Sequence, residues 1–165
     1  MAPSDTPDSY DERSILLQML RYSQETAIGK VRGLSEEQAR TAPLPTSPSM
    51  SPANVLNHLR WVEWSWINED LFGGPEVSPM LADRPYSSFD EGSVLPLDEV
   101  LRLYEEQAAA SLAVFAEVDL DMRMVGTYSK DPLTARWILQ HLIEETARHN
   151  GHLDILREMI DGSVG

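Results

Sequence analysis

The chain has 165 residues, which is long enough for one domain that buries its own hydrophobic core. Hydrophobic residues make up 42% of the sequence and charged residues 24%, and no segment approaches the ~20 apolar residues of a transmembrane helix. The 27 acidic and 13 basic residues give a formal net charge of −14, and no Lys/Arg cluster offsets it. We therefore expect a globular protein with no nucleic-acid partner and no membrane partner, because both of those surfaces are anionic.

The absence of cysteine limits the chemistry that the chain can perform by itself. Disulfides, thiolate metal sites and a sulfur nucleophile of the protein are all excluded, so any thiol chemistry needs a thiol from outside. The N-terminus lacks the basic start and apolar stretch of a signal peptide, which predicts a cytoplasmic protein. Residues 1–8 carry Pro, Ser, Asp and Thr without apolar periodicity and are expected to form a flexible arm, followed by a single domain over residues 9–165.

Two long helices are predicted in the first half of the chain. Apolar residues recur at three- and four-residue spacing over residues 9–30, and Gly29 and Gly33 flank the end of that segment. A short capped helix is expected over 34–40, before three prolines interrupt regular structure. A serine N-cap followed by proline then starts a second long helix over 51–72, and Gly-Gly-Pro at 73–75 ends it.

The second half of the chain predicts two more helices and a long connection before them. Residues 75–95 contain three prolines and little periodicity, so this connection must cross the bundle or cover one end of it. A third helix is expected over 96–118 and a fourth over 132–161, the latter ended by Gly162. With no β-alternating run, the pattern favours an all-α fold, an antiparallel four-helix bundle with a long connection between helices two and three.

The histidines are concentrated in the predicted fourth helix. The chain has four histidines, and three of them lie within twelve residues. At about 100° per residue, one narrow stripe of that helix contains His141, Glu145, His149 and His152. Apolar residues border the stripe on both sides, so these polar groups are predicted to face the core. A carboxylate in a core is costly unless a cation or hydrogen bonds compensate it, which suggests a bound ion.

The spacing of these residues selects a ligand set. Glu145 and His149 are one helical turn apart and can reach one ion, as can His149 and His152. His141 and His149 are roughly 12 Å apart along the axis, too far to share it. His58, on the inner face of the second helix, is available as a third ligand. The set His58, Glu145 and His149 is typical of catalytic zinc and compatible with nickel, iron or manganese, with His152 orienting a ligand or moving protons.

Other interpretations of these residues remain open. A single inward histidine is usually a core residue, so the metal hypothesis depends on the cluster. Trp61, Trp64 and Trp66 could line a substrate cavity, although packing in the core and at helix ends is favoured. Glu63 is interpreted as a surface or supporting residue rather than a general base. The sequence contains no glycine-rich phosphate loop and no recognisable context for a catalytic triad.

The segments 57–63 and 137–154 resemble the DinB-like superfamily, most closely the actinobacterial branch with mycothiol-dependent maleylpyruvate isomerase and mycothiol S-transferases. The resemblance implies a four-helix bundle that can pair as a homodimer, with a metal held by a histidine of helix two and a Glu/His-xxx-His pair of helix four. Carried across by position, it implies His58, Glu145 and His149 as ligands. Many relatives have His in place of Glu145, and His152 stands where relatives often have Gln.

The resemblance also implies an external low-molecular-weight thiol that the metal converts to a thiolate. That thiolate would attack a small electrophile, or add transiently to a double bond so that it isomerises. Our first hypothesis is therefore a metal-dependent thiol S-transferase or isomerase that uses a mycothiol-like thiol, with His152 as a catalytic proton carrier. The alternatives are a non-catalytic, stress-related metal- or ligand-binding bundle protein, and a bundle whose histidines are only core residues.

Overall fold

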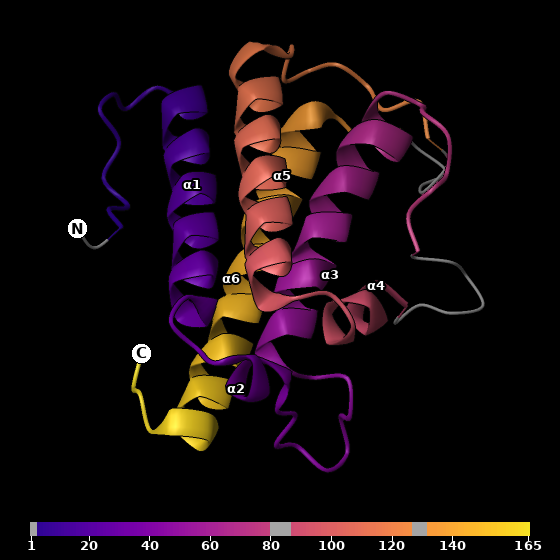
Figure 1. Cartoon of the computed structure of the whole chain (residues 1–165). Helices are drawn as coiled ribbons and strands as arrows, with labels where there is room; N and C mark the ends of the chain where they lie inside the picture. The colour runs from indigo at the N-terminus through magenta and orange to yellow at the C-terminus, as the bar shows by residue number, and fades with distance from the viewer. Residues whose placement is uncertain (1–2, 80–86, 127–131) are drawn as a thin grey trace.

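Four long helices pack side by side in the computed structural model, which describes residues 3–79, 87–126 and 132–165 (Figure 1). The long helices are α1 (Glu12–Val31), α3 (Pro52–Trp64), α5 (Leu97–Glu117) and α6 (Ala135–Asp161), and the short α2 (Glu36–Arg40) follows α1. The predicted all-α bundle is thus confirmed. Among the described helices, none combines the length and apolar character needed to cross a membrane.

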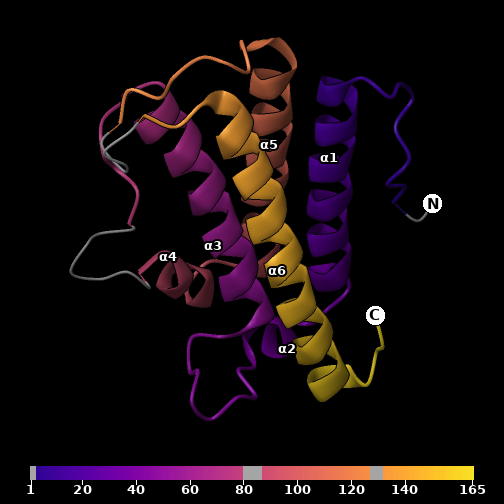
Figure 2. The ribbon, with the colours of Figure 1, turned by 180° about the vertical axis from the view of Figure 1, so that it is seen from behind.

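The directions of the four helices follow from the long connection between α3 and α5. Helix α5 begins at the end of the bundle where α3 begins, so α3 and α5 run in the same direction (Figures 1 and 2). Helices α1 and α6 run in the opposite direction. The site-bearing pair α3 and α6 is therefore antiparallel, and the two helices contact each other.

Capping residues set the ends of the two helices that matter most for the site. The Ser51 side chain accepts a hydrogen bond from the backbone of Asn54, and proline follows at the first helical position of α3. The Thr134 side chain caps α6 in the same way, so that helix begins three residues later than the sequence predicts. Gly162, with φ of 78°, ends α6 in the left-handed conformation that glycine adopts without steric cost.

The last part of the predicted second helix is wider than an α-helix. Instead of continuing to Phe72 as regular α-helix, the chain forms the π-helix η1 (Ser65–Leu71) directly after α3. The backbone N–H of Phe72 donates to the carbonyl of Ile67, five residues earlier, at 3.1 Å. An apolar pattern with a 3.6-residue period does not reveal one extra residue in a turn. Such π-turns occur frequently at functional sites.

The described residues 87–93 of the connection before α5 are helical and pack on α3. Residues 80–86 of the predicted connection fall outside the described part of the chain, and the remainder contains α4 (Ser87–Asp90) and the 3₁₀ turn η2 (Glu91–Ser93). Gly92 permits the close approach, because a Cβ atom there would lie 2.7 Å from the carbonyl oxygen of Ala53. The Asn57 side chain donates to the Ser88 carbonyl at 2.6 Å, which fastens α4 to α3.

The core consists of two apolar clusters with a polar layer between them along the helices. One cluster contains Ala27, Leu56 and Leu153, and the other contains Leu20, Trp66 and Leu142. Between these levels every long helix contributes a buried polar side chain, and we call this set the polar layer: Gln24, Glu63, Tyr104, Ser111 and Thr146. The core is therefore interrupted by hydrogen-bonding groups midway along the bundle.

Candidate metal centre

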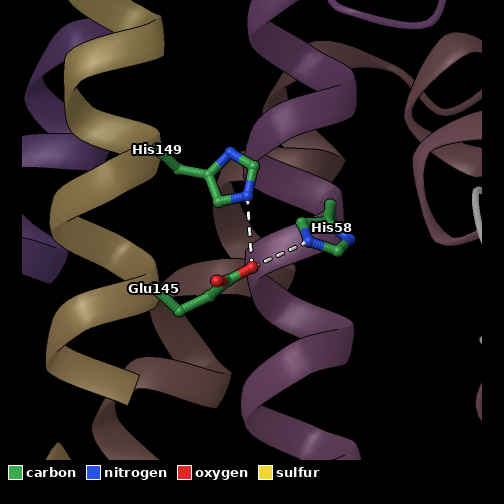
Figure 3. Close-up of side chains that lie close together, drawn as sticks. All are labelled: His58, Glu145 and His149. Carbon is green, nitrogen blue, oxygen red and sulfur yellow. Dashed lines mark hydrogen bonds and ion pairs between the residues drawn. The ribbon is translucent and has the colours of Figure 1, made fainter. Parts of the chain in front are cut away.

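Three side chains predicted as metal ligands meet between α3 and α6 (Figure 3). The Nε2 atom of His58 lies 3.4 Å from Oε1 of Glu145, and Nε2 of His149 lies 3.3 Å from the same oxygen. One potential ligand atom from each of the three residues lies within 4.8 Å of the other two. The structure thus brings together a carboxylate and two imidazoles from helices that are far apart in the sequence.

The cluster lies at the edge of the apolar face of α6 rather than in its middle. Fully or almost fully buried Leu142, Thr146 and Leu153 mark the middle of that face. The side chains of His149 and Glu145 are 8% and 13% exposed, so they lie just below the surface, where α3 meets α6. The sequence predicted that the whole stripe would point into the core, and this holds for His149 but not for its other members. The site is accordingly shielded by only a thin layer of protein.

The protonation states at the cluster are set by neighbours and by burial. Hydrogen bonds from His149 and His58 hold the pKa of Glu145 well below its usual range, so this carboxylate is ionised. Arg148, whose Nη1 lies 3.3 Å from Glu145 Oε2, adds a cation on the other side. Burial lowers the pKa of His58, which favours a neutral imidazole. Ionised carboxylate and neutral imidazole are the forms that bind metal ions.

His58 is held in place by two residues of α4. The Oγ atom of Ser88 lies 2.8 Å from His58 Nδ1, and the Phe89 ring stacks on the imidazole at 4.1 Å with an interplanar angle of 10°. With Nδ1 hydrogen-bonded, Nε2 is directed toward Glu145. Partners of this kind fix the orientation of a ligating histidine. Sequence analysis missed both residues, since the connection that carries them has no periodic pattern.

His152 lies behind His149. Its Nδ1 atom is 3.2 Å from His149 Nδ1, and the two ring centroids are 5.0 Å apart. His152 thus contacts the ring nitrogen of His149 that is not directed at Glu145, and its role in orienting a ligand stays a prediction. Burial lowers the pKa of His152. Its role as a catalytic proton carrier stays a prediction.

A comparison with known protein families extends this description to the whole chain. The family model for mycothiol S-transferase matches residues 15–162. The chain belongs to the mycothiol S-transferase family. This match confirms the resemblance to the DinB-like branch, and it covers α3, α6 and all three members of the cluster. A search of curated proteins found no match.

In this member of the mycothiol S-transferase family, the tryptophans of the second predicted helix have separate roles. Trp66 is buried in the core, as predicted, and its ring meets the edge of His141, with centroids 4.9 Å apart. Trp61 and Trp64 meet edge to face at 5.7 Å beside a surface cavity of about 360 Å³. His141 lies one turn before Glu145, at the edge of the site as the sequence predicts.

Of the two interpretations of Glu63, the surface one is wrong. Glu63 was interpreted as a surface or supporting residue, but it is fully buried in the polar layer. Its carboxyl group accepts hydrogen bonds from Gln24 Nε2 at 2.9 Å and from the Tyr104 hydroxyl at 3.2 Å. Burial raises the pKa of Glu63 despite these hydrogen bonds. The position was predictable from spacing, because Glu63 follows the core residue Leu59 by one turn.

The donor set and its spacing fit a divalent ion. Ligand atoms at 2.0–2.2 Å from a tetrahedral ion lie roughly 3.3–3.6 Å apart. The two distances from Glu145 Oε1 to the imidazole nitrogens, 3.3 and 3.4 Å, fall in this range. Two nitrogens and one oxygen are typical of catalytic zinc in proteins, which leaves a further position for an external ligand. That the cluster binds an ion stays a prediction.

Proposed function

We propose that this protein is a divalent-metal-dependent S-transferase that joins a mycothiol-like low-molecular-weight thiol to a small electrophile. The observation that carries the proposal is the convergence of one carboxylate and two imidazoles within 4.8 Å, in a chain of the mycothiol S-transferase family. A divalent ion bound there would lower the pKa of a coordinated thiol and so supply a thiolate at neutral pH. The chain has no cysteine and could not supply that nucleophile itself.

Each residue of the site has its own role in the proposed reaction. His58, Glu145 and His149 hold the ion, which we take to be zinc, with nickel, iron and manganese also compatible with the donor set. Ser88 and Phe89 keep the His58 ring in its orientation. His152, in contact with His149 and only partly buried, accepts the thiol proton and passes it to solvent.

The proposed transfer balances for two kinds of electrophile. With a carbon that bears a leaving group, the thiol sulfur forms a bond to carbon while the leaving group departs with its electron pair. With an activated double bond, the sulfur adds to one carbon, and the other carbon takes up a proton. Reversal of that addition after rotation about the former double bond would isomerise the substrate, which is the related activity that the sequence suggested.

A second candidate is a metal-binding protein that does not catalyse a reaction. The observation in its favour is the low exposure of the two histidines, which leave little of the cluster open to a large substrate: His58 is 7% exposed and His149 6%. A bound ion would then stabilise the α3–α6 contact without turnover.

The test is metal content by plasma mass spectrometry on the untagged protein, with His58→Ala and Glu145→Ala variants. We expect a bound divalent ion in the parent and none in either variant. Glu144→Ala is the matched control, because Glu144 neighbours Glu145 in sequence but pairs with Arg148 at the surface. A folded parent that holds no ion even after reconstitution contradicts the proposal.

Turnover is then measured with mycothiol and iodoacetamide, before and after removal of the ion. Thiol transfer that depends on the ion supports the S-transferase. A bound ion without transfer to iodoacetamide or to other electrophiles of this size supports the second candidate instead.

A further inference from the structure

The stripe of α6 that carries Glu145 and His149 becomes more exposed toward the start of the helix. The exposed fraction of the side chain is 8% for His149, 13% for Glu145 and 25% for His141, and Trp137 as a whole residue is 40% exposed. These residues follow one another at intervals of four along the helix, so the exposure rises with each turn. Exposure along α6 therefore increases from the cluster toward Trp137.

Three aromatic rings lie at this more exposed part of the stripe, and we call them the aromatic wall: Trp66, Trp137 and His141. His141 stacks on Trp137, with ring centroids 5.0 Å apart and an interplanar angle of 17°. Trp66 contacts both rings, at 5.4 Å from Trp137 and 4.9 Å from His141. Because Trp66 is almost fully buried, it holds the other two rings against the bundle.

The aromatic wall is built by both helices of the site. Trp66 belongs to the π-helix η1, so the widened turn after α3 lies opposite the start of α6. A tryptophan that is two-fifths exposed while stacked on a partly exposed histidine presents a rigid apolar surface to solvent. Removing an exposed tryptophan ring from water is favourable, because the ring has a large apolar area. A planar aromatic partner covers that area best when it stacks on the face of the ring.

The distances along α6 place this surface within reach of a reacting group at the cluster. One turn separates His141 from Glu145 and two turns separate Trp137 from it, which is about 6 and 12 Å along the axis. A carbon attacked by a thiol at the cluster must come within about 3–3.5 Å of the sulfur. An aromatic ring that contains or bears that carbon then extends over His141 toward Trp137.

We propose that Trp137 and His141, backed by Trp66, form a subsite that stacks the planar aromatic group of the electrophile; this rests on the proposed S-transfer. With an aryl halide, the thiol sulfur forms the new carbon–sulfur bond, the carbon–halogen bond breaks, halide leaves with the electron pair, and the thiol proton passes to solvent.

The first test measures binding alone, by calorimetry with 1,3-dinitrobenzene, an uncharged ring without a leaving group. It uses the metal-free and the metal-loaded protein, each as parent, Trp137→Ala and Trp137→Phe. We expect roughly 10-fold weaker binding in Trp137→Ala and near-parental binding in Trp137→Phe, because stacking needs a ring rather than an indole. Trp64→Ala is the matched control and should bind as the parent does, since Trp64 lies beside the separate cavity with Trp61.

The second test separates the electrophile from the thiol as the occupant. In Trp137→Ala, KM for 1-chloro-2,4-dinitrobenzene should rise roughly 10-fold with kcat little changed, while KM for iodoacetamide and KM for mycothiol stay at the parental values. A rise in KM for mycothiol instead would show that the aromatic wall binds the thiol, which overturns the proposal. An equal rise for both electrophiles overturns it as well.

The two proposals fail in different ways. A parent that binds no ion or transfers no thiol disproves the proposed function, while calorimetry with 1,3-dinitrobenzene still decides whether the aromatic wall takes a planar ring. Unchanged binding of 1,3-dinitrobenzene in a folded Trp137→Ala variant, or no binding by the parent, overturns the aromatic subsite even where S-transfer is intact.

Discussion

Glu145 and Glu63 are two glutamates of the same bundle whose surroundings shift their pKa values in opposite directions. Glu145 lies at the edge of the α3–α6 contact, between two imidazoles and Arg148, and its pKa is lowered. Glu63 lies in the polar layer, surrounded by neutral donors, and its pKa is raised. The groups around Glu145 favour its charged form. The groups around Glu63 only partly offset the cost of removing its charge from water.

The difference shows that burial alone does not mark a metal ligand. Both carboxylates accept hydrogen bonds, but only Glu145 has nitrogen atoms beside it that can share an ion. The partners of Glu63 are an amide and hydroxyl groups on α1 and α5, which hold helices together and bind zinc poorly. The groups at the edge of the bundle can therefore hold an ion, whereas those at its centre fix how the helices pack against one another.

The largest effect that would test this contrast is a change in stability on truncating Glu63. Glu63→Ala leaves buried donors of Gln24 and Tyr104 unpaired, so we expect a loss of about 3 kcal/mol in the free energy of unfolding. Urea denaturation of the metal-free protein measures it. Metal content should remain that of the parent, whereas Glu145→Ala should lose the ion. A folded Glu63→Ala variant that has lost its ion would break the contrast.

A smaller effect is expected from the residue that orients His58. Ser88→Ala removes the hydroxyl at 2.8 Å from His58 Nδ1, so metal affinity should fall roughly 10- to 100-fold, as is usual when the partner of a ligating histidine is removed. Competition with a chelator measures the affinity. Ser93→Ala is the matched control, because Ser93 also hydrogen-bonds α3 from the same connection, through Asn54, without touching His58. Equal losses in both variants would show that Ser88 acts only by packing.

The smallest effect concerns the pH dependence of stability. The pKa of Glu63 is raised in the folded protein from an ordinary value of 4.5, so the folded state retains a proton that the unfolded state loses above that pH. The contribution of Glu63 is therefore fully present below pH 4.5 and decreases as pH rises toward the raised pKa, by at most about 1.4 kcal/mol per pH unit. Glu63→Gln should lack this decrease. Denaturation at several pH values compares the two proteins, and parallel curves would contradict the raised pKa.

Much of the fold follows from local signals in the sequence. The serine and proline that start α3 and the glycine after α6 act through backbone geometry within a few residues, so these ends were predictable. The same is true of Glu145 and His149, whose side chains share one turn of a helix. Their convergence with His58 was inferred from the shortage of other ligands and is reproduced by the structure.

The remainder depends on contacts that no local pattern encodes. The approach of Ser88 to His58 joins residues thirty positions apart through a connection without periodicity. The π-turn η1 adds one residue to a turn, which shifts the positions of the side chains without changing the composition. Glu63 was interpreted as a surface or supporting residue, although its four-residue interval from Leu59 fitted the core.

Gly92 is a position where few substitutions would be tolerated, although Gly92 itself is not part of the three-residue cluster. Its hydrogen atoms leave room for the backbone of Ala53 and Asn54, where a methyl group would come within 2.8 Å of both. A side chain at this position would lift the connection from α3 and carry Ser88 and Phe89 away from His58. Selection that preserves the candidate metal centre would then also act on Gly92, which contacts none of its three side chains. Substitutions at this position would be limited by the short distance between the backbones of the connection and α3.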